Sequence, residues 1–493
     1  MGWYMSSPTG IGRREKLLVL STCCLSLFIV GLDNTILNVA LPSIRGDLNA
    51  SVSQLQWTID AYTLVLAALL MVAGSTADRI GRRRVFQTGL VVFAAGSALC
   101  AVAPGLGWLV AFRVVQAVGG SMLNPVAMSI ITNTFTEPRE RARAIGAWSA
   151  VIGVAMALGP IVGGALVDSA GWRSVFWMNL PVALVAIVLT ALYVPESKAA
   201  HPRRADPVGQ VLVFVFLLSL TYTIIEGRAQ GWSSPLIIGL FLLAAGCLAG
   251  LVYRSPRRVE PLIDLRFFRS VPFAGATVTA VCTFAAMSGF LFLNTLYLQD
   301  ARGWSPTEAG LRTLPMAVMT VVFAPISGRL VARIGPRVPL VAAGVAMATG
   351  AALLVGLAQD TSTVRMVAAY GVFGVGFGLV NAPITNTAVS GMPRAQAGVA
   401  SAIASTSRQF GQCLGVAVVG TTIASVPGAP GGADLAAATH TGWWIVLGCA
   451  GAVAVLGMLT TGRRALRTAE RTGAELMPAA PPAGTQETTD VRQ

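Results

Sequence analysis

Runs of about 20 apolar residues, separated by short loops that carry most of the charge, repeat along almost the whole chain. Only 11% of the 493 residues are charged, and the mean hydropathy is +0.69. A soluble globular protein carries roughly 25% charged residues, so this chain lacks the polar surface that water requires. The pattern predicts an all-α polytopic membrane protein. It excludes a secreted enzyme, a nucleic-acid-binding protein and a disordered protein.

The apolar spans predict fourteen transmembrane helices, at about residues 17–41, 54–76, 85–103, 107–132, 142–166, 174–194, 208–226, 235–253, 271–298, 308–330, 338–357, 364–390, 398–425 and 441–461. A cytoplasmic N-terminus places most loop Lys and Arg residues on the cytoplasmic side, as the positive-inside rule requires. The net charge of +14 is therefore explained by orientation in the bilayer. We expect a multi-pass protein of the plasma membrane, with both termini cytoplasmic and no nucleic-acid partner.

An internal repeat divides the chain. The segment from Gly74 to Arg82 is repeated, with changes, from Gly328 to Pro336, on the same side of the membrane in this topology. This indicates a parallel repeat about an axis along the membrane normal. The predicted parts are a cytoplasmic N-terminus (1–16), a six-helix bundle (17–194), a linker with two extra helices (195–270), a second six-helix bundle (271–461) and a disordered cytoplasmic tail (462–493). Duplicated bundles of this kind are typical of alternating-access transporters.

Four motifs follow one another in the first part of the chain. They run from Leu32 to Pro42, from Gly74 to Arg83, from Arg113 to Gly119 and from Gly153 to Gly164. In this order they resemble the helix-1, loop 2–3, helix-4 and helix-5 motifs of the fourteen-helix drug:proton antiporters (EmrB/QacA type) of the major facilitator superfamily. Ala117 stands where the helix-4 motif usually has glycine. The resemblance implies the major facilitator fold, two six-helix bundles plus two central linker helices, and proton-coupled drug export.

Asp33 lies deep within an otherwise apolar helix. A carboxylate there costs at least roughly 2.5–3.5 kcal/mol, so it should face a cavity or a partner. Burial disfavours the charged form and allows protonation near neutral pH. We assign proton coupling to Asp33 and to Arg113, an arginine that the resemblance associates with proton transfer. A structural carboxyl group and a purely structural ion pair remain the alternatives.

Asp60 is a second buried acid, and it shares a helix face with Gln56 and Trp57. A carboxylate beside an indole suits a lipophilic cation, through charge pairing and cation–π contact. We assign these three residues to substrate binding, together with Asn34 and Asn38. The two asparagines equally well fit helix contacts, and Asp60 also fits an acid at the wet end of a helix.

The resemblance further implies two moving parts. The loop 2–3 motif implies a cytoplasmic gate formed by Gly74, Asp78, Arg79, Gly81 and Arg82. The helix-5 antiporter motif implies a seam formed by Gly153, Gly159, Pro160, Gly163 and Gly164. Small residues there permit close approach to a helix of the other bundle. Topology-setting charge and ordinary helix packing are the alternatives. Two more intramembrane charges, Arg408 and Arg312, have no assigned role.

Together these features predict a secondary active exporter of hydrophobic, cationic drugs or antibiotics that is not an enzyme. No G-x-x-x-x-G-K-[ST] motif occurs in the sequence, so we expect the proton gradient and not ATP to drive transport, without a cofactor or a metal. The expected partners are a small-molecule substrate, protons and the lipid bilayer, and we expect a functional monomer. The alternatives are export of an endogenous secondary metabolite or another non-cationic molecule, nutrient import, and a membrane enzyme or sensor.

Overall fold

The computed structural model describes residues 12–199, 206–258, 261–392, 397–423 and 433–476, and every regular element in these ranges is a helix. The first group of helices, which we call the first bundle, consists of α1 (Arg13–Leu48), α2 (Val52–Ile80), α3 (Arg82–Ala101), α4 (Leu106–Ser121), α5 (Leu123–Thr134), α6 (Pro138–Ala170), α7 (Ser174–Trp177) and α8 (Asn179–Tyr193). The pairs α4–α5 and α7–α8 are each interrupted at a single methionine, Met122 and Met178. The all-helical expectation is confirmed.

The remaining helices form a linker and a second group. The linker holds α9 (Pro207–Glu226), α10 (Pro235–Arg254) and two short 3-10 helices, η1 (Ser255–Arg257) and η2 (Leu265–Arg269). The second bundle consists of α11 (Val271–Leu296), its π-helical extension η3 (Tyr297–Ala301), α12 (Pro306–Ile334), α13 (Arg337–Ala352), α14 (Thr363–Val389), α15 (Ala397–Ile423) and α16 (Ala433–Thr460). Helix α17 (Arg463–Leu476) follows.

Within the described residues, eleven helices are long and apolar enough to cross a membrane. Two more apolar helical stretches, Leu158–Ala170 within α6 and the whole of α13 (Arg337–Ala352), are shorter than the required length among the described residues. The count of fourteen spans and the limits of the two bundles therefore stay predictions.

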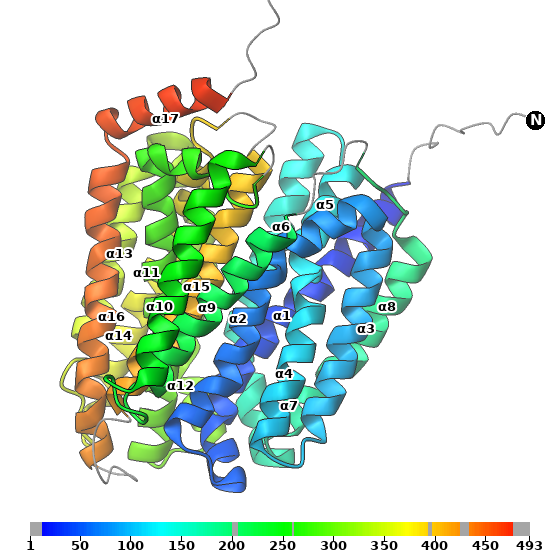
Figure 1. Ribbon diagram of the computed structural model, residues 1–493. Helices are drawn as coiled ribbons and strands as arrows, with labels where there is room; N and C mark the ends of the chain where they lie inside the picture. Colours follow the sequence, from blue (N-terminus) through cyan, green and yellow to red (C-terminus); the bar gives the residue numbers. More distant parts are fainter. Residues whose placement is uncertain (1–11, 200–205, 259–260, 393–396, 424–432, 477–493) are drawn as a thin grey trace, which may run out of the picture.

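Helix α17 corrects one expectation, because part of the tail that was predicted to be disordered is helical. Ala465, Ala469, Thr472 and Leu476 recur at helical spacing and are buried. In Figure 1 this helix lies across the upper end of the second bundle. The amide of Val271 donates to the hydroxyl of Thr468 at 2.9 Å, which fixes α17 to the start of α11. Residues 477–493 are outside the described part of the chain.

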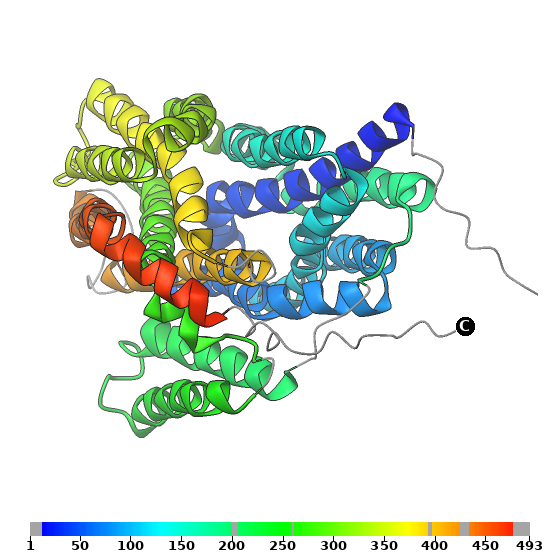
Figure 2. The same ribbon diagram turned by 90° about the horizontal axis from the view of Figure 1, so that it is seen from above.

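The two bundles lie side by side, and the α9–α10 hairpin lies at one edge of the molecule (Figures 1 and 2). Helix α9 packs against both α2 and α15, which belong to different bundles. Helix α10 packs on the far side of α9. The linker therefore covers the junction between the bundles on this side.

Several contacts join the bundles at the end where α1 reaches Leu48, which we call the lower end because it is at the bottom of Figure 1. Arg45 of α1 forms an ion pair with Asp300 of η3 at 3.2 Å. The neighbouring Gln299 donates from Nε2 to the carbonyl of Val39 at 2.9 Å. These bonds hold the lower ends of the bundles together.

Glycines bring α6 of the first bundle against α12 of the second. A Cβ atom on Gly164 would lie 2.5 Å from the carbonyl oxygen of Pro306. A Cβ atom on Gly310 would overlap the carbonyl oxygen of Pro160. Backbone therefore touches backbone here, as expected where helices approach through small residues.

This contact predicts that Gly310→Ala lowers the stability of the closed protein, because the added methyl group forces α6 and α12 apart. Overpacking of this kind costs about 1–3 kcal/mol. The matched control is Gly328→Ala in the same helix, where no described atom lies within 4 Å of the new Cβ. We expect a lower melting temperature for Gly310→Ala in detergent and no loss for the control. Equal melting temperatures would contradict the contact.

Candidate functional site

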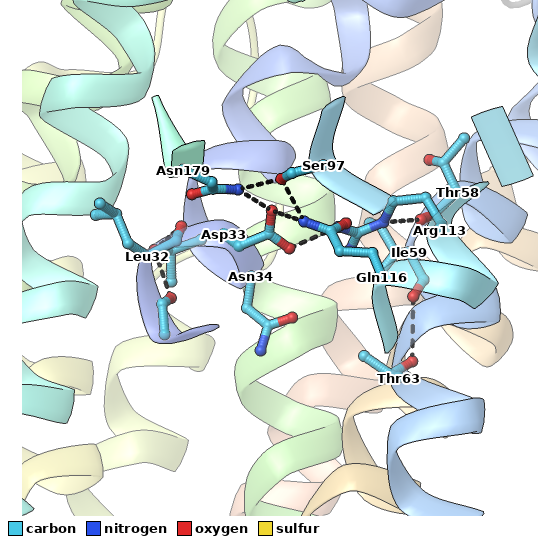
Figure 3. Close-up of polar contacts among 12 residues, drawn as sticks. Leu32, Asp33, Asn34, Thr58, Ile59, Thr63, Ser97, Arg113, Gln116 and Asn179 are labelled. Carbon is cyan, nitrogen blue, oxygen red and sulfur yellow. Dashed lines mark hydrogen bonds and ion pairs between the residues drawn. The ribbon is translucent and has the colours of Figure 1, made fainter. Parts of the chain in front are cut away.

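A buried polar network surrounds Asp33 in the middle of the first bundle (Figure 3). Arg113 donates from Nη1 to Asp33 Oδ2 at 2.5 Å. Gln116 and Asn179 donate from their amide nitrogens to Asp33 Oδ1, each at 2.9 Å. Both amides also donate to the hydroxyl oxygen of Ser97 at 2.9 Å. Helices α1, α4 and α8 therefore meet at one carboxylate, and Ser97 joins α3 to it through the two amides.

The guanidinium of Arg113 is held on several sides. Its Nε donates to the backbone carbonyl of Thr58 in α2 at 3.2 Å. It lies over the ring of Tyr62, 4.1 Å from the centroid, and 5.9 Å from the centroid of Phe176. Only 1% of the Arg113 side chain and 3% of the Asp33 side chain are exposed. The pair is therefore desolvated, and its charges depend on each other.

The hydrogen bonds around Asp33 determine how the network responds to a change in its charge. Every donor around Asp33 stabilises the ionised carboxylate. Protonation would leave the guanidinium of Arg113 buried without its counter-ion, so the network must rearrange when the proton arrives. The predicted pair Asp33 and Arg113 is thus brought together, while its role in coupling stays a prediction.

Sequence reasoning missed three members of this network as site residues. Gln116 lies inside the motif from Arg113 to Gly119, three residues after Arg113, and this position was the available signal. Asn179, at the start of α8, lies outside the four motifs. Ser97 gives no such signal, because a serine in an apolar helix usually bonds to its own backbone.

The predicted substrate residues of helix α2 lie at the junction with α9 and α15. Gln56 donates from Nε2 to the carbonyls of Val416 and Ala417 in α15, both at 2.9 Å. Trp57 points to α9, where its indole donates to Glu226 at 3.0 Å. The three predicted residues therefore do not share one open face.

Asp60 is completely buried near the same junction. Neither oxygen of its carboxyl group has a hydrogen-bond partner among the described residues. The thiol of Cys413 in α15 is next to it. A buried carboxyl group without strong donors is costly, which makes Asp60 the second functional candidate in the fold.

The two predicted asparagines of α1 bond to each other. Asn38 donates from Nδ2 to the backbone carbonyl of Asn34 at 2.8 Å. In Figure 3 the side chain of Asn34 points away from the Asp33 network. Asn38 is buried and Asn34 is half-buried. A role in substrate binding stays a prediction for both.

The gate residues of loop 2–3 are held at the upper end of the first bundle. Asp78 forms an ion pair with Arg82 at 2.9 Å. Gly81 has a φ of 130° and faces the carboxyl group of Glu196, so a side chain there would be strained and obstructed. The amide of Arg82 donates to the carbonyl of Ser197 at 2.9 Å.

Two more predicted gate residues, Gly74 and Arg79, lie in α2. A Cβ atom on Gly74 would make an ordinary contact with Pro125, at 3.6 Å. Arg79 is largely exposed in the last turn of α2. The role of these residues as a cytoplasmic gate stays a prediction.

The antiporter-motif residues of α6 lie at helix contacts. A Cβ atom on Gly159 would overlap Thr35 of α1, and one on Gly163 would lie 3.1 Å from Ile36. Pro160 and Gly164 face α12 at Gly310 and Pro306, as described above. The motif therefore packs α6 against a helix of each bundle.

One call on this motif, Gly153, falls outside the residues whose surroundings the structure describes.

The two unassigned arginines lie apart from this site. Arg408 of α15 donates to the hydroxyls of Thr385 at 3.3 Å and Ser405 at 3.0 Å. Arg312 is exposed and lies over the ring of Trp304, 4.8 Å from the centroid. In the described part of the chain, neither arginine forms a hydrogen bond or an ion pair with Asp33, Arg113, Gln116, Asn179 or Ser97.

Comparison with known proteins identifies the class. Residues 23–416 match the sequence profile of the Major Facilitator Superfamily. Multidrug resistance protein Stp of Mycobacterium tuberculosis (strain CDC 1551 / Oshkosh) is 38% identical over 414 residues, which cover 84% of this chain and 77% of that protein. The Tetracenomycin C resistance and export protein of Streptomyces glaucescens is 37% identical over 414 residues, which cover 82% and 76%.

The fold comparison agrees. A D-xylose-proton symporter matches with a TM-score of 0.65 at 15% identity, covering 90% of this chain and 97% of the symporter. At this identity the likeness concerns the fold alone. The chain belongs to the major facilitator superfamily, whose members are membrane transporters and not enzymes.

The geometry of the buried pair predicts that a variant lacking only Arg113 is less stable than a variant lacking both charges. Arg113→Gln leaves the Asp33 carboxylate buried without a counter-ion, and removal of one partner of such a pair costs about 3–5 kcal/mol. We expect a clear fall in the melting temperature of the purified protein. Adding Asp33→Asn removes the stranded charge and should restore most of the loss.

The control is Arg312→Gln, which removes an exposed arginine and should leave the melting temperature unchanged. A double variant as unstable as Arg113→Gln alone would mean that the two charges do not depend on each other.

Proposed function

We propose that this protein is a proton-coupled exporter of hydrophobic, cationic drugs or antibiotics, driven by the proton gradient without ATP, a cofactor or a metal. The observation that carries the proposal is the buried Asp33–Arg113 pair, whose ionisable carboxylate joins α1, α4 and α8. The names of the relatives support export as the direction, since they include a multidrug resistance protein and a tetracenomycin C resistance and export protein.

The proposal includes the membrane arrangement. Fourteen helices cross the plasma membrane, both termini are cytoplasmic, and the lower end faces outward, because the loops at the upper end carry more Lys and Arg. The protein acts as a monomer. In this orientation the contacts between Arg45 and Asp300 and between α6 and α12 close the outer side.

The proposed cycle follows from the chemistry of Asp33. With the outer side open, a proton binds Asp33 and removes its attraction to Arg113. The protein then closes outward and opens inward, and the proton leaves to the cytoplasm. The potential contributes about 2.3 kcal/mol for each charge moved through 100 mV. Asp78 and Arg82 act as the cytoplasmic latch that closes the inner side while the outer side is open.

The substrate site proposed for this cycle is Asp60 with its neighbours. Gln56 bonds α2 to α15, and Asp60, one helical turn further along α2, is buried near the same junction. A lipophilic cation reaches the carboxylate only when the two helices part. Trp57 then supplies an aromatic face for it, once the indole leaves Glu226. Asn34 and Asn38 line the approach from α1.

A second candidate function is export of an endogenous secondary metabolite. The relative from Streptomyces glaucescens, a tetracenomycin C resistance and export protein, favours this alternative. The two candidates share the Asp33 network and differ only in what Asp60 and its neighbours bind.

The proposal is tested by Asp33→Asn. The variant cannot ionise at this position, so it should lose proton-coupled export while remaining inserted and abundant. The measurement is efflux of ethidium, a cationic dye, from cells with and without an uncoupler. Wild-type efflux should stop when the uncoupler is added. Efflux by Asp33→Asn at the wild-type rate across the pH range would make Asp33 structural.

Asp60→Asn separates the two candidate substrates. Neutralising the carboxylate should weaken binding of cationic substrates by roughly 1.5–3 kcal/mol, the scale of a hydrogen bond to a charged group. Neutral compounds should lose far less. Resistance to a lipophilic cation and to a neutral drug is measured in the same strain at matched expression. Equal losses for both compounds would remove Asp60 from the substrate site.

A further inference from the structure

The linker helix α9 is attached to both bundles along the junction of α2 and α15. Towards α2, Glu226 accepts a hydrogen bond from the indole of Trp57 at 3.0 Å. Towards α15, the ring of Phe216 lies 6.5 Å from that of Phe410, measured between centroids. Leu217 of α9 is buried in the same junction. Helix α9 therefore packs against both helices of this junction and covers it on one side.

A small polar cluster lies where the three helices meet. The hydroxyl of Thr221 in α9 is 3.3 Å from the sulfur of Cys413 in α15. The same thiol is next to the carboxyl group of Asp60 and the hydroxyl of Thr63 in α2. All four side chains are buried. The cluster therefore links the linker helix to the buried acid through one sulfur atom.

The hydrogen-bond donors in this cluster can act in one order, from Thr221 to Cys413 and from Cys413 to Asp60. The hydroxyl of Thr63 donates to the backbone carbonyls of Ile59 and Asp60, at 3.2 and 3.3 Å, so its proton is engaged. The hydroxyl of Thr221 contacts Cys413, and it can donate to the sulfur. The thiol can then donate its own proton to the carboxylate, as a weak donor. Neither carboxylate oxygen of Asp60 has a hydrogen-bond partner among the described residues, so both are free to accept a hydrogen bond from the thiol.

We propose that α9 closes the Asp60 site on the side of the bilayer, and that Thr221 is a positioning residue that orients the Cys413 thiol towards Asp60. This rests on the proposed function, in which Asp60 pairs with a cationic substrate. A thiol donor favours the ionised carboxylate, and only the ionised carboxylate attracts a cation. The linker helix thereby contributes to substrate specificity.

The first test compares two isosteric substitutions on the same helix. Thr221→Val removes the hydroxyl that contacts Cys413. The matched control is Thr223→Val, because Thr223 is also fully buried but its hydroxyl donates, among the described residues, to the carbonyl of Ser219 within α9. Thr221→Ser keeps the hydroxyl and should behave like the wild type.

The measurement is transport by the full-length protein in proteoliposomes with an imposed proton gradient. The probes are tetraphenylphosphonium, a lipophilic cation, and chloramphenicol, a neutral drug. For Thr221→Val we expect KM for tetraphenylphosphonium to rise roughly 3- to 10-fold, the effect of one weak hydrogen bond, with kcat unchanged. KM for chloramphenicol should not change.

The outcomes distinguish this inference from the proposed function. If Thr221→Val and Thr223→Val have the same KM for the cation while the wild type exports it, the role of Thr221 is overturned and the proposed function stands. If the wild type moves neither probe in response to the gradient, the proposed function fails and this inference fails with it.

A second test does not depend on transport. Thr221→Cys places a second thiol beside Cys413, and mild oxidation should join residues 221 and 413 in a disulfide, detected by mass spectrometry of the linked peptides. Thr223→Cys points elsewhere on the helix and should not form this link. Absence of the 221–413 disulfide, or equal linking by both variants, would overturn the placement of α9 at the Asp60 site.

Discussion

The ion pair between Asp33 and Arg113 is the interaction on which the first bundle depends. Two charges far from water are tolerated only if each finds its counter-ion and its remaining donors and acceptors are satisfied. Here Gln116, Asn179 and the backbone of Thr58 complete the set. The requirement ties α1, α2, α4 and α8 into one unit. A change in the charge of Asp33 must therefore alter contacts of all four helices.

The same network reaches the junction between the bundles. Arg113 holds the carbonyl of Thr58, and this residue lies in α2 between Gln56 and Asp60. Gln56 bonds to the backbone of α15, and Asp60 is buried beside Cys413 of that helix. A continuous path of contacts thus connects the proposed proton site with the surface that must open and close. We propose that this path couples the proton to movement of the bundles.

Much of this could be predicted from the sequence, and the reasons for the failures are local. The runs of apolar residues and the charges of the loops predicted the helices. The position of Asp33 deep within an apolar helix predicted that its carboxylate needs a partner such as Arg113. Helical spacing alone could not predict that Trp57 turns to Glu226, because the linker helix packs there through tertiary contacts. Ser97 carried no signal at all. The helicity of α17 was missed because its apolar face consists mainly of alanine and threonine.

The central claim is that the charge of Asp33 couples the proton to the binding of a cationic substrate at Asp60. Proton release on substrate binding tests it most directly. Purified protein in weakly buffered detergent solution, with a pH-sensitive dye, is mixed with tetraphenylphosphonium. The account predicts that the wild type releases protons as the cation binds and that Asp33→Asn releases none. Equal release by both proteins, or binding without release in a wild type whose transport requires the proton gradient, would contradict it.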